Sequence, residues 1–145
     1  MQQRNELDEA LLGLGRALTR YRKDAGGTAV RFISLTECLM WIRALDENIG
    51  SLLPSVPPSL VGLRLARNRS VHQLAAVTDT IGRRLPMPLP SPLRGQIVWL
   101  PLSQIPSGNK APAQERAYET ELAGKPVERT IQDALILFAS VLKVP

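Results

Sequence analysis

The chain has 145 residues, with 18 Lys and Arg against 13 Asp and Glu, so its formal net charge is +5. Apolar residues make up 44% and charged residues 21%, which excludes a disordered chain and fits one soluble domain. The single cysteine, Cys38, excludes an intrachain disulfide, and the single histidine, His72, leaves no Cys/His set for zinc. We therefore expect no metal and no cofactor.

The first periodic segment predicts a helix over residues 4–24. Its apolar residues step by four, three, four and three positions, which places them on one stripe of a helix. The stripe consists of Leu7, Leu11, Leu14, Leu18 and Tyr21. Asn5 is the expected N-cap, and Gly26 and Gly27 end the helix.

A second helix is predicted over residues 34–50. A capping box, Ser34 to Glu37, marks its start, and Cys38 is interpreted as a small core residue. Asp46 and Glu47 are candidates to assist at a cleft but are interpreted as surface residues, as paired acids late in a helix usually are. A third helix is predicted over residues 60–85, where its apolar stripe is interrupted by polar residues before Pro86.

Prolines set residues 86–122 apart from the rest of the chain, because seven of the twelve lie between 86 and 112. Within this insertion, residues 95–100 are β-branched and aromatic and predict a strand. Residues 117–122 are either its antiparallel partner or a short helix.

The last helix is predicted over residues 126–143, with Pro126 at its first position. It is apolar over most of its circumference, so we expect it to be central. Four long helices with one proline-rich, possible β-hairpin insertion predict a mainly α, single-domain helical bundle over residues 1–145.

The candidate site lies on the third helix, where three arginines and the only histidine fall within nine residues: Arg64, Arg67, Arg69 and His72. Asn68 is four positions from both Arg64 and His72 and shares a helix face with each. Arg67 and His72 are five apart, which is about 140° around an ideal helix. They converge only through the reach of arginine, a bend in the helix or a second copy of it.

Arg67-Asn68-x-x-x-His72 resembles the R-x(4–6)-H motif of the HEPN superfamily, including the polar residue directly after the arginine that its ribonucleases commonly carry. The resemblance in sequence covers about a dozen residues, and the order of the predicted helices extends it over most of the chain. The insertion before the last helix is longer than the family's plain bundle requires.

The resemblance implies a metal-independent RNA endonuclease that works as a homodimer, with two motifs lining one cleft. His72 would act as general acid or base, Arg67 would bind the scissile phosphate, and Asn68 would hydrogen-bond and orient His72 or the phosphate. Arg64 and Arg69 are assigned to binding the RNA backbone. The family's toxin and phage-defence members imply an antitoxin or another regulatory protein as a further partner.

Two alternatives stay open at this point. The chain is a catalytically inactive HEPN-like module for dimeric interaction or nucleic-acid binding, or an unrelated small bundle such as a phage-encoded accessory protein. A structural interpretation of the same residues also stays open: the arginines lie on a solvated face, and His72 caps a loop or bonds a carbonyl. The first ten residues lack the pattern of a signal peptide and no apolar run spans a bilayer, so we expect a cytoplasmic protein without membrane contact.

Overall fold

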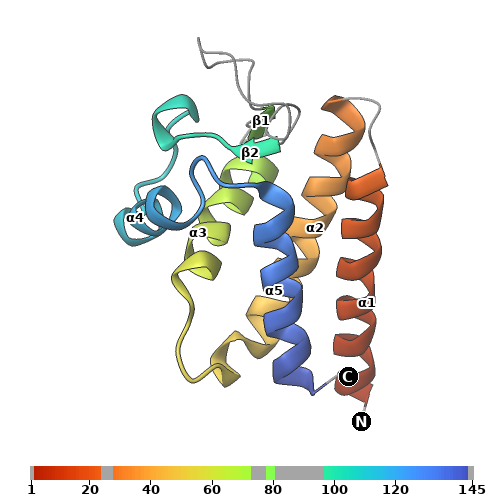
Figure 1. Cartoon of the computed structure of the whole chain (residues 1–145). Helices are drawn as coiled ribbons and strands as arrows, with labels where there is room; N and C mark the ends of the chain where they lie inside the picture. The colour runs from red at the N-terminus through yellow and green to blue at the C-terminus, as the bar shows by residue number, and fades with distance from the viewer. Residues whose placement is uncertain (1, 24–27, 73–77, 81–96, 144–145) are drawn as a thin grey trace.

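The computed structural model describes residues 2–23, 28–72, 78–80 and 97–143, with side chains described for 4–23, 31–70 and 97–143. Three long helices lie side by side: α1 (Gln2–Lys23), α2 (Thr28–Ile49) and α5 (Val127–Leu142). Two shorter helices, α3 (Pro58–Arg67) and α4 (Pro112–Glu121), pack against each other on the α2 side (Figure 1). The predicted mainly α helical bundle is confirmed.

The long helices match the sequence predictions, but two predicted starts are wrong. The first helix begins at Gln2, so Asn5 lies inside it instead of capping it. The second begins at Thr28, which places the supposed capping box inside the helix, where Ser34 is buried. Both helices have 22 residues and pack together along their length. Packing of an apolar face outweighs a local capping signal, because most of a helix's stability in a protein comes from tertiary contact.

The third helix is much shorter than predicted. After α3, residues Asn68–His72 form a π-helical turn, η2, and Thr78–Thr80 form a strand, β1. The prediction of one helix over 60–85 is therefore wrong, and its residues 73–77 and 81–85 lie outside the described ones. β1 pairs antiparallel with β2 (Ile97–Trp99), with Thr78 opposite Trp99. β-branched residues suit this pairing, which competes with the helical pattern read from the sequence.

The insertion contains the predicted strand but not the predicted hairpin. β2 lies within the expected residues 95–100, whereas most of residues 117–122 belong to α4, as the short-helix alternative had it. The other edge of β2 meets the turn before α5: the Gly124 N–H donates to the Trp99 carbonyl at 2.8 Å, and the Trp99 N–H donates to the Lys125 carbonyl at 3.1 Å. β2 therefore joins β1 to the start of α5.

The core lies between the three long helices and continues to Trp99 and Tyr118. Its fully buried side chains come from every helix, and Trp99 and Tyr118 meet edge to face with their ring centroids 6.5 Å apart. α5 is not enclosed on all sides as expected, because Ile136 is 58% exposed. Within the described ranges, no helix combines the length and apolarity needed to cross a bilayer.

Candidate functional site

The predicted site residues lie where α3 gives way to η2. Pro57 caps α3 with extended backbone, and Pro58 follows at its start, where a missing N–H breaks no helical hydrogen bond. Leu63 and Ala66 are buried in the core, which turns Arg64 and Arg67 to the partly exposed side of the helix. The apolar stripe of α3 thus fixes which face carries the arginines.

The π-helical turn changes the relation between Arg67 and His72. A π-helix closes hydrogen bonds between residues five apart, so residues i and i+5 are separated by one hydrogen-bonded turn. In an ideal α-helix the same two positions diverge by about 140°. The backbone at His72 ends this turn, and its side chain lies outside the described ones. A π-helical turn, wider than the turn of an α-helix, therefore lies between the two backbone positions.

Arg64 forms a bidentate ion pair with Asp46 of α2. Its Nε donates to Oδ2 at 2.7 Å and its Nη2 donates to Oδ1 at 2.8 Å. These hydrogen bonds raise the pKa of Arg64, and the Asp46 side chain is only 6% exposed. Asp46 is thus a buried residue, not a surface one as interpreted from the sequence. The guanidinium assigned to RNA already has an intrachain partner.

Arg67 lies in a cluster whose other charges are paired. Arg43 and Glu47 form one ion pair, at 2.7 Å, and Arg64 and Asp46 form the other. Arg67 donates one hydrogen bond to Oδ1 of Asn68, at 3.2 Å, and its buried Nε has no partner among the described residues. Burial, and then the charge of Arg43, lower the pKa of Arg67.

Arg69 lies in a different environment from the one predicted. Its side chain is 4% exposed, and Nη1 donates to the Pro106 carbonyl at 2.8 Å, while Nη2 lies 3.5 Å from Oε1 of Glu115. These contacts attach the end of α3 to the segment before α4 and to α4 itself. The structure therefore gives Arg69 an intrachain contact where the sequence suggested an exposed cation.

Sequence reasoning missed the acidic partners and one buried hydroxyl. Asp46 is 18 positions from Arg64 and Glu115 is 46 from Arg69, so no local spacing connects them. Ser70 is fully buried, and its Oγ has no hydrogen-bond partner among the described residues. A buried hydroxyl without a partner is costly. The sequence signal for it is only its place inside the arginine cluster.

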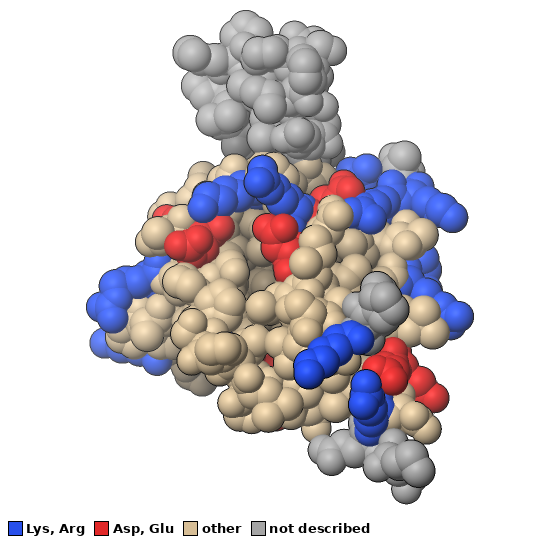
Figure 2. Space-filling model, turned by 60° about the horizontal axis from the view of Figure 1, so that its bottom comes forward, with Lys and Arg blue, Asp and Glu red and all other residues tan. Residues whose placement is uncertain are grey.

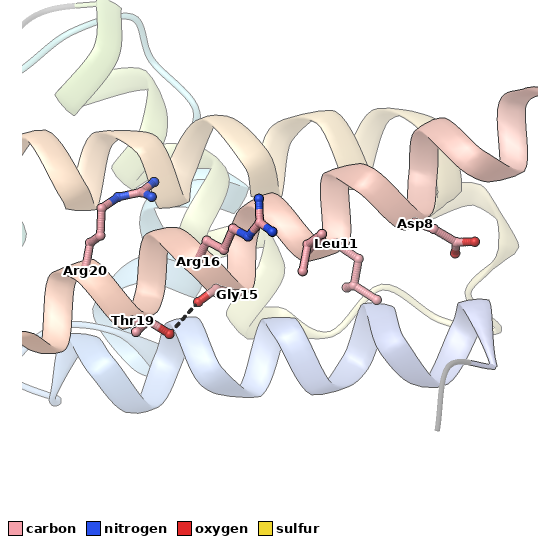
Figure 3. Close-up of a pocket in the computed structure, with 7 residues that line it drawn as sticks. Asp8, Leu11, Gly15, Arg16, Thr19 and Arg20 are labelled. Carbon is pink, nitrogen blue, oxygen red and sulfur yellow. Dashed lines mark hydrogen bonds between the residues drawn. The ribbon is translucent and has the colours of Figure 1, made fainter.

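Two pockets occur elsewhere on the described surface. One lies on the outer face of α1 (Figure 3), and the other is lined by the start of α5 and the end of α4, including Glu121, Lys125, Arg129 and Asp133. Charges of both signs are interspersed on the face that Figure 2 shows, without one large basic area. That face therefore offers no broad surface for a polyanion.

Comparisons of the chain with protein-family models, with curated proteins and with solved structures gave no match. The functional argument therefore rests on the chain's own residues.

Proposed function

We propose that the protein is a metal-independent RNA endonuclease of HEPN-like type, built around Arg67 and His72. One observation carries the proposal: Arg67 is a cation without an ionic partner among the described side chains, and one π-helical turn separates its backbone from that of His72. An arginine beside already neutralised pairs retains its full charge for a ligand. A phosphate diester suits its planar fork of donors.

The chemistry follows from these two groups. His72 accepts the proton of a ribose 2′-hydroxyl, whose oxygen forms a bond to phosphorus while the bond to the 5′-oxygen breaks. The leaving oxygen takes a proton from an acid, for which a second copy of His72 across a dimer axis is available. Arg67 stabilises the charge that develops on the phosphate oxygens, and Asn68 orients the arginine. The products end in a 2′,3′-cyclic phosphate and a 5′-hydroxyl.

The same proposal includes the assembly and the biology. In this proposal, the C-terminal ends of two α3 helices meet in a homodimer and line one RNA cleft. The protein acts in the cytoplasm, and a regulatory protein such as an antitoxin restrains its activity. The toxin or defence role follows from the HEPN-like motif alone.

One observation favours a second candidate function, a catalytically inactive interaction or nucleic-acid-binding module. Arg64 and Arg69 have intrachain acidic partners, so the charge available near Arg67 is small. A cleft in which each chain contributes one unpaired cation among its described site residues binds RNA more weakly than one with three.

The deciding experiment measures cleavage of a labelled single-stranded RNA in EDTA by the full chain and its variants. Arg67→Ala and His72→Ala should each lose cleavage by about 10²- to 10⁴-fold, since each removes a transition-state contact. Arg43→Ala is the matched control, because Arg43 is a neighbouring arginine with its own partner, and it should retain cleavage.

Melting temperatures separate chemistry from folding in the same set. Variants that lose cleavage without a lower melting temperature, and products with 2′,3′-cyclic ends, support the enzyme. If the wild-type chain does not cleave RNA but binds it, and Arg67→Ala weakens this binding, the result supports the nucleic-acid-binding module instead. Full activity of His72→Ala rejects the mechanism.

A further inference from the structure

The outer face of α1 carries an acid, an apolar residue and a base in a row. Asp8, Leu12 and Arg16 are spaced four residues apart, so they stand above one another on successive turns. All three are exposed, and Leu12 is exposed to 53%. Figure 3 shows the pocket on this face, with Asp8 towards one end and Gly15 and Arg16 further along. We call Asp8, Leu12, Gly15 and Arg16 the α1 face.

The two charges of the α1 face have no ion-pair partner among the side chains that the structure describes. Asp8 and Arg16 are two turns apart, about 12 Å along the axis, which is too far for a direct ion pair. Neither forms an ion pair with any described residue, whereas Arg20 and Arg22 of the same helix pair with Glu37 and Glu128. The acid and the base are thus left unpaired on either side of an exposed leucine.

Gly15 adds an independent observation. A Cβ at Gly13 would lie 2.5 Å from the Trp41 ring, so packing against α2 accounts for that glycine. A Cβ at Gly15 would meet nothing within 4 Å. Glycine inside a helix is unfavourable relative to alanine, and no contact within the described part of the chain explains this one. A partly exposed glycine on a helix surface allows another backbone to approach closely.

We propose that the α1 face is a self-association surface, on which α1 of a second copy of this chain lies antiparallel. With the two-fold axis at Leu12, residue i of one helix lies opposite residue 24 − i of the other. Leu12 then meets the partner's Leu12, and Asp8 faces the partner's Arg16 while Arg16 faces the partner's Asp8. One symmetric contact therefore forms two ion pairs, each between Asp8 of one copy and Arg16 of the other.

This proposal goes beyond the proposed function and is independent of it. α1 and α3 lie at opposite sides of the bundle, with α2 and α5 between them (Figure 1). An α1 contact therefore does not bring two copies of Arg67 together, and it leaves the α3 end accessible. Because the proposed function has its own homodimer contact at the α3 end, the presence of a dimer does not by itself tell the two contacts apart. The charge variants of the α1 face do, since they should change assembly without changing the α3 end.

Sedimentation velocity of the full chain over about 1–100 micromolar tests the contact, since a single helix pair makes a small interface of modest affinity. Asp8→Arg and Arg16→Asp should each raise the dissociation constant by at least about tenfold, because each places like charges opposite each other twice. The double variant Asp8→Arg/Arg16→Asp should restore it. Glu6→Arg is the matched control, an exposed acid of α1 that lies about 120° around the helix from Leu12; it makes the same change of charge and should have no effect.

A second measurement fixes the register. The native Cys38 is buried, so in the Leu12→Cys variant the new cysteine carries the exposed thiol. If residue 12 lies on the two-fold axis, this thiol should form a disulfide with its copy in the partner when exposed to air. Ile136→Cys, an equally exposed apolar position on α5, should not. A wild-type chain that stays monomeric at the highest concentration overturns the proposal and assigns the α1 face to another protein or to solvent. Single charge variants that assemble as the wild type does also overturn it.

Discussion

The three long helices and the α3–α4 side of the molecule are held together in different ways. α1, α2 and α5 meet through continuous apolar stripes, and their ion pairs, such as Arg22 with Glu128, lie at the exposed edges. The α3–α4 side uses polar contacts inside the structure: Asp46 with Arg64, Arg69 with Pro106 and Glu115, and Trp99 with Thr130. Helical periodicity explains how the three long helices pack, whereas the α3–α4 side depends on particular partners that are distant in sequence.

The largest difference in stability should appear between variants of two adjacent acids of α2, Asp46 and Glu47. Asp46→Asn should lower the free energy of unfolding by about 2–3 kcal/mol, because it leaves Arg64 with a neutral partner in a largely buried site. Glu47→Gln should lower it by less than about 0.5 kcal/mol, since the Arg43–Glu47 pair is exposed on one helix. Urea unfolding of both variants measures this. Equal values would show that the α2–α3 junction does not depend on its ion pair.

A second comparison uses two glycines, Gly62 at the contact between α3 and α4 and Gly13 at the contact between α1 and α2. A Cβ at Gly62 would lie 3.1 Å from the Tyr118 Cα and 2.7 Å from the Leu122 Cδ1, so α3 and α4 would have to separate. We expect Gly62→Ala to lower the free energy of unfolding by about 1–2 kcal/mol. Gly13→Ala should lower it by less, because its clash is with the Trp41 ring, a side chain that can shift, and alanine favours the helix by about 1 kcal/mol. A larger loss for Gly13→Ala than for Gly62→Ala would contradict this difference.

The smallest expected change in stability is the loss at alkaline pH over the interval from pH 9 to 10. Burial raises the pKa of the Cys38 thiol from 9.0 to about 12. Above pH 9 the unfolded chain loses this proton while the folded chain keeps it, so stability falls by about 1.4 kcal/mol per pH unit. Burial also raises the pKa values of Tyr21 and Tyr118, which adds to the slope above pH 10.

Thermal unfolding of the wild type and of Cys38→Ala between pH 9 and 10 isolates the share of the thiol. The variant should show a flatter dependence on pH in this interval, even if its absolute stability is lower. A wild-type slope retained in Cys38→Ala would mean that other groups titrate there.

The sequence predicted the elements whose apolar residues recur at a regular helical spacing. The stripes of α1 and α5 indicate their positions to within a few residues, because each helix buries one continuous face. The third helix was predicted too long because Val77 and Ile81 fit the helical period. The pairing of Thr78–Thr80 with Ile97–Trp99 depends on a contact that no local pattern contains.

The candidate site shows the same limit. The arginines and Asn68 were found because they cluster in sequence, but the partners of Arg64 and Arg69 lie on α2 and α4. Asp46 was interpreted as a surface residue since nothing near it in the chain indicates a buried cation. The π-helical turn, which brings the backbones of Arg67 and His72 to one turn's separation, has no signature in the sequence.

The position of β2 between β1 and the turn before α5 has a consequence for the order of folding. Trp99 holds Thr130 through a 3.0 Å bond from its Nε1, across 31 residues, and its backbone bonds with Gly124 and Lys125. Closing such a loop becomes favourable only after α5 has docked on α1 and α2, since the entropy of the intervening chain must first be overcome. We therefore expect the strand pair to form after the folding barrier, so that weakening it speeds unfolding and leaves the refolding rate unchanged.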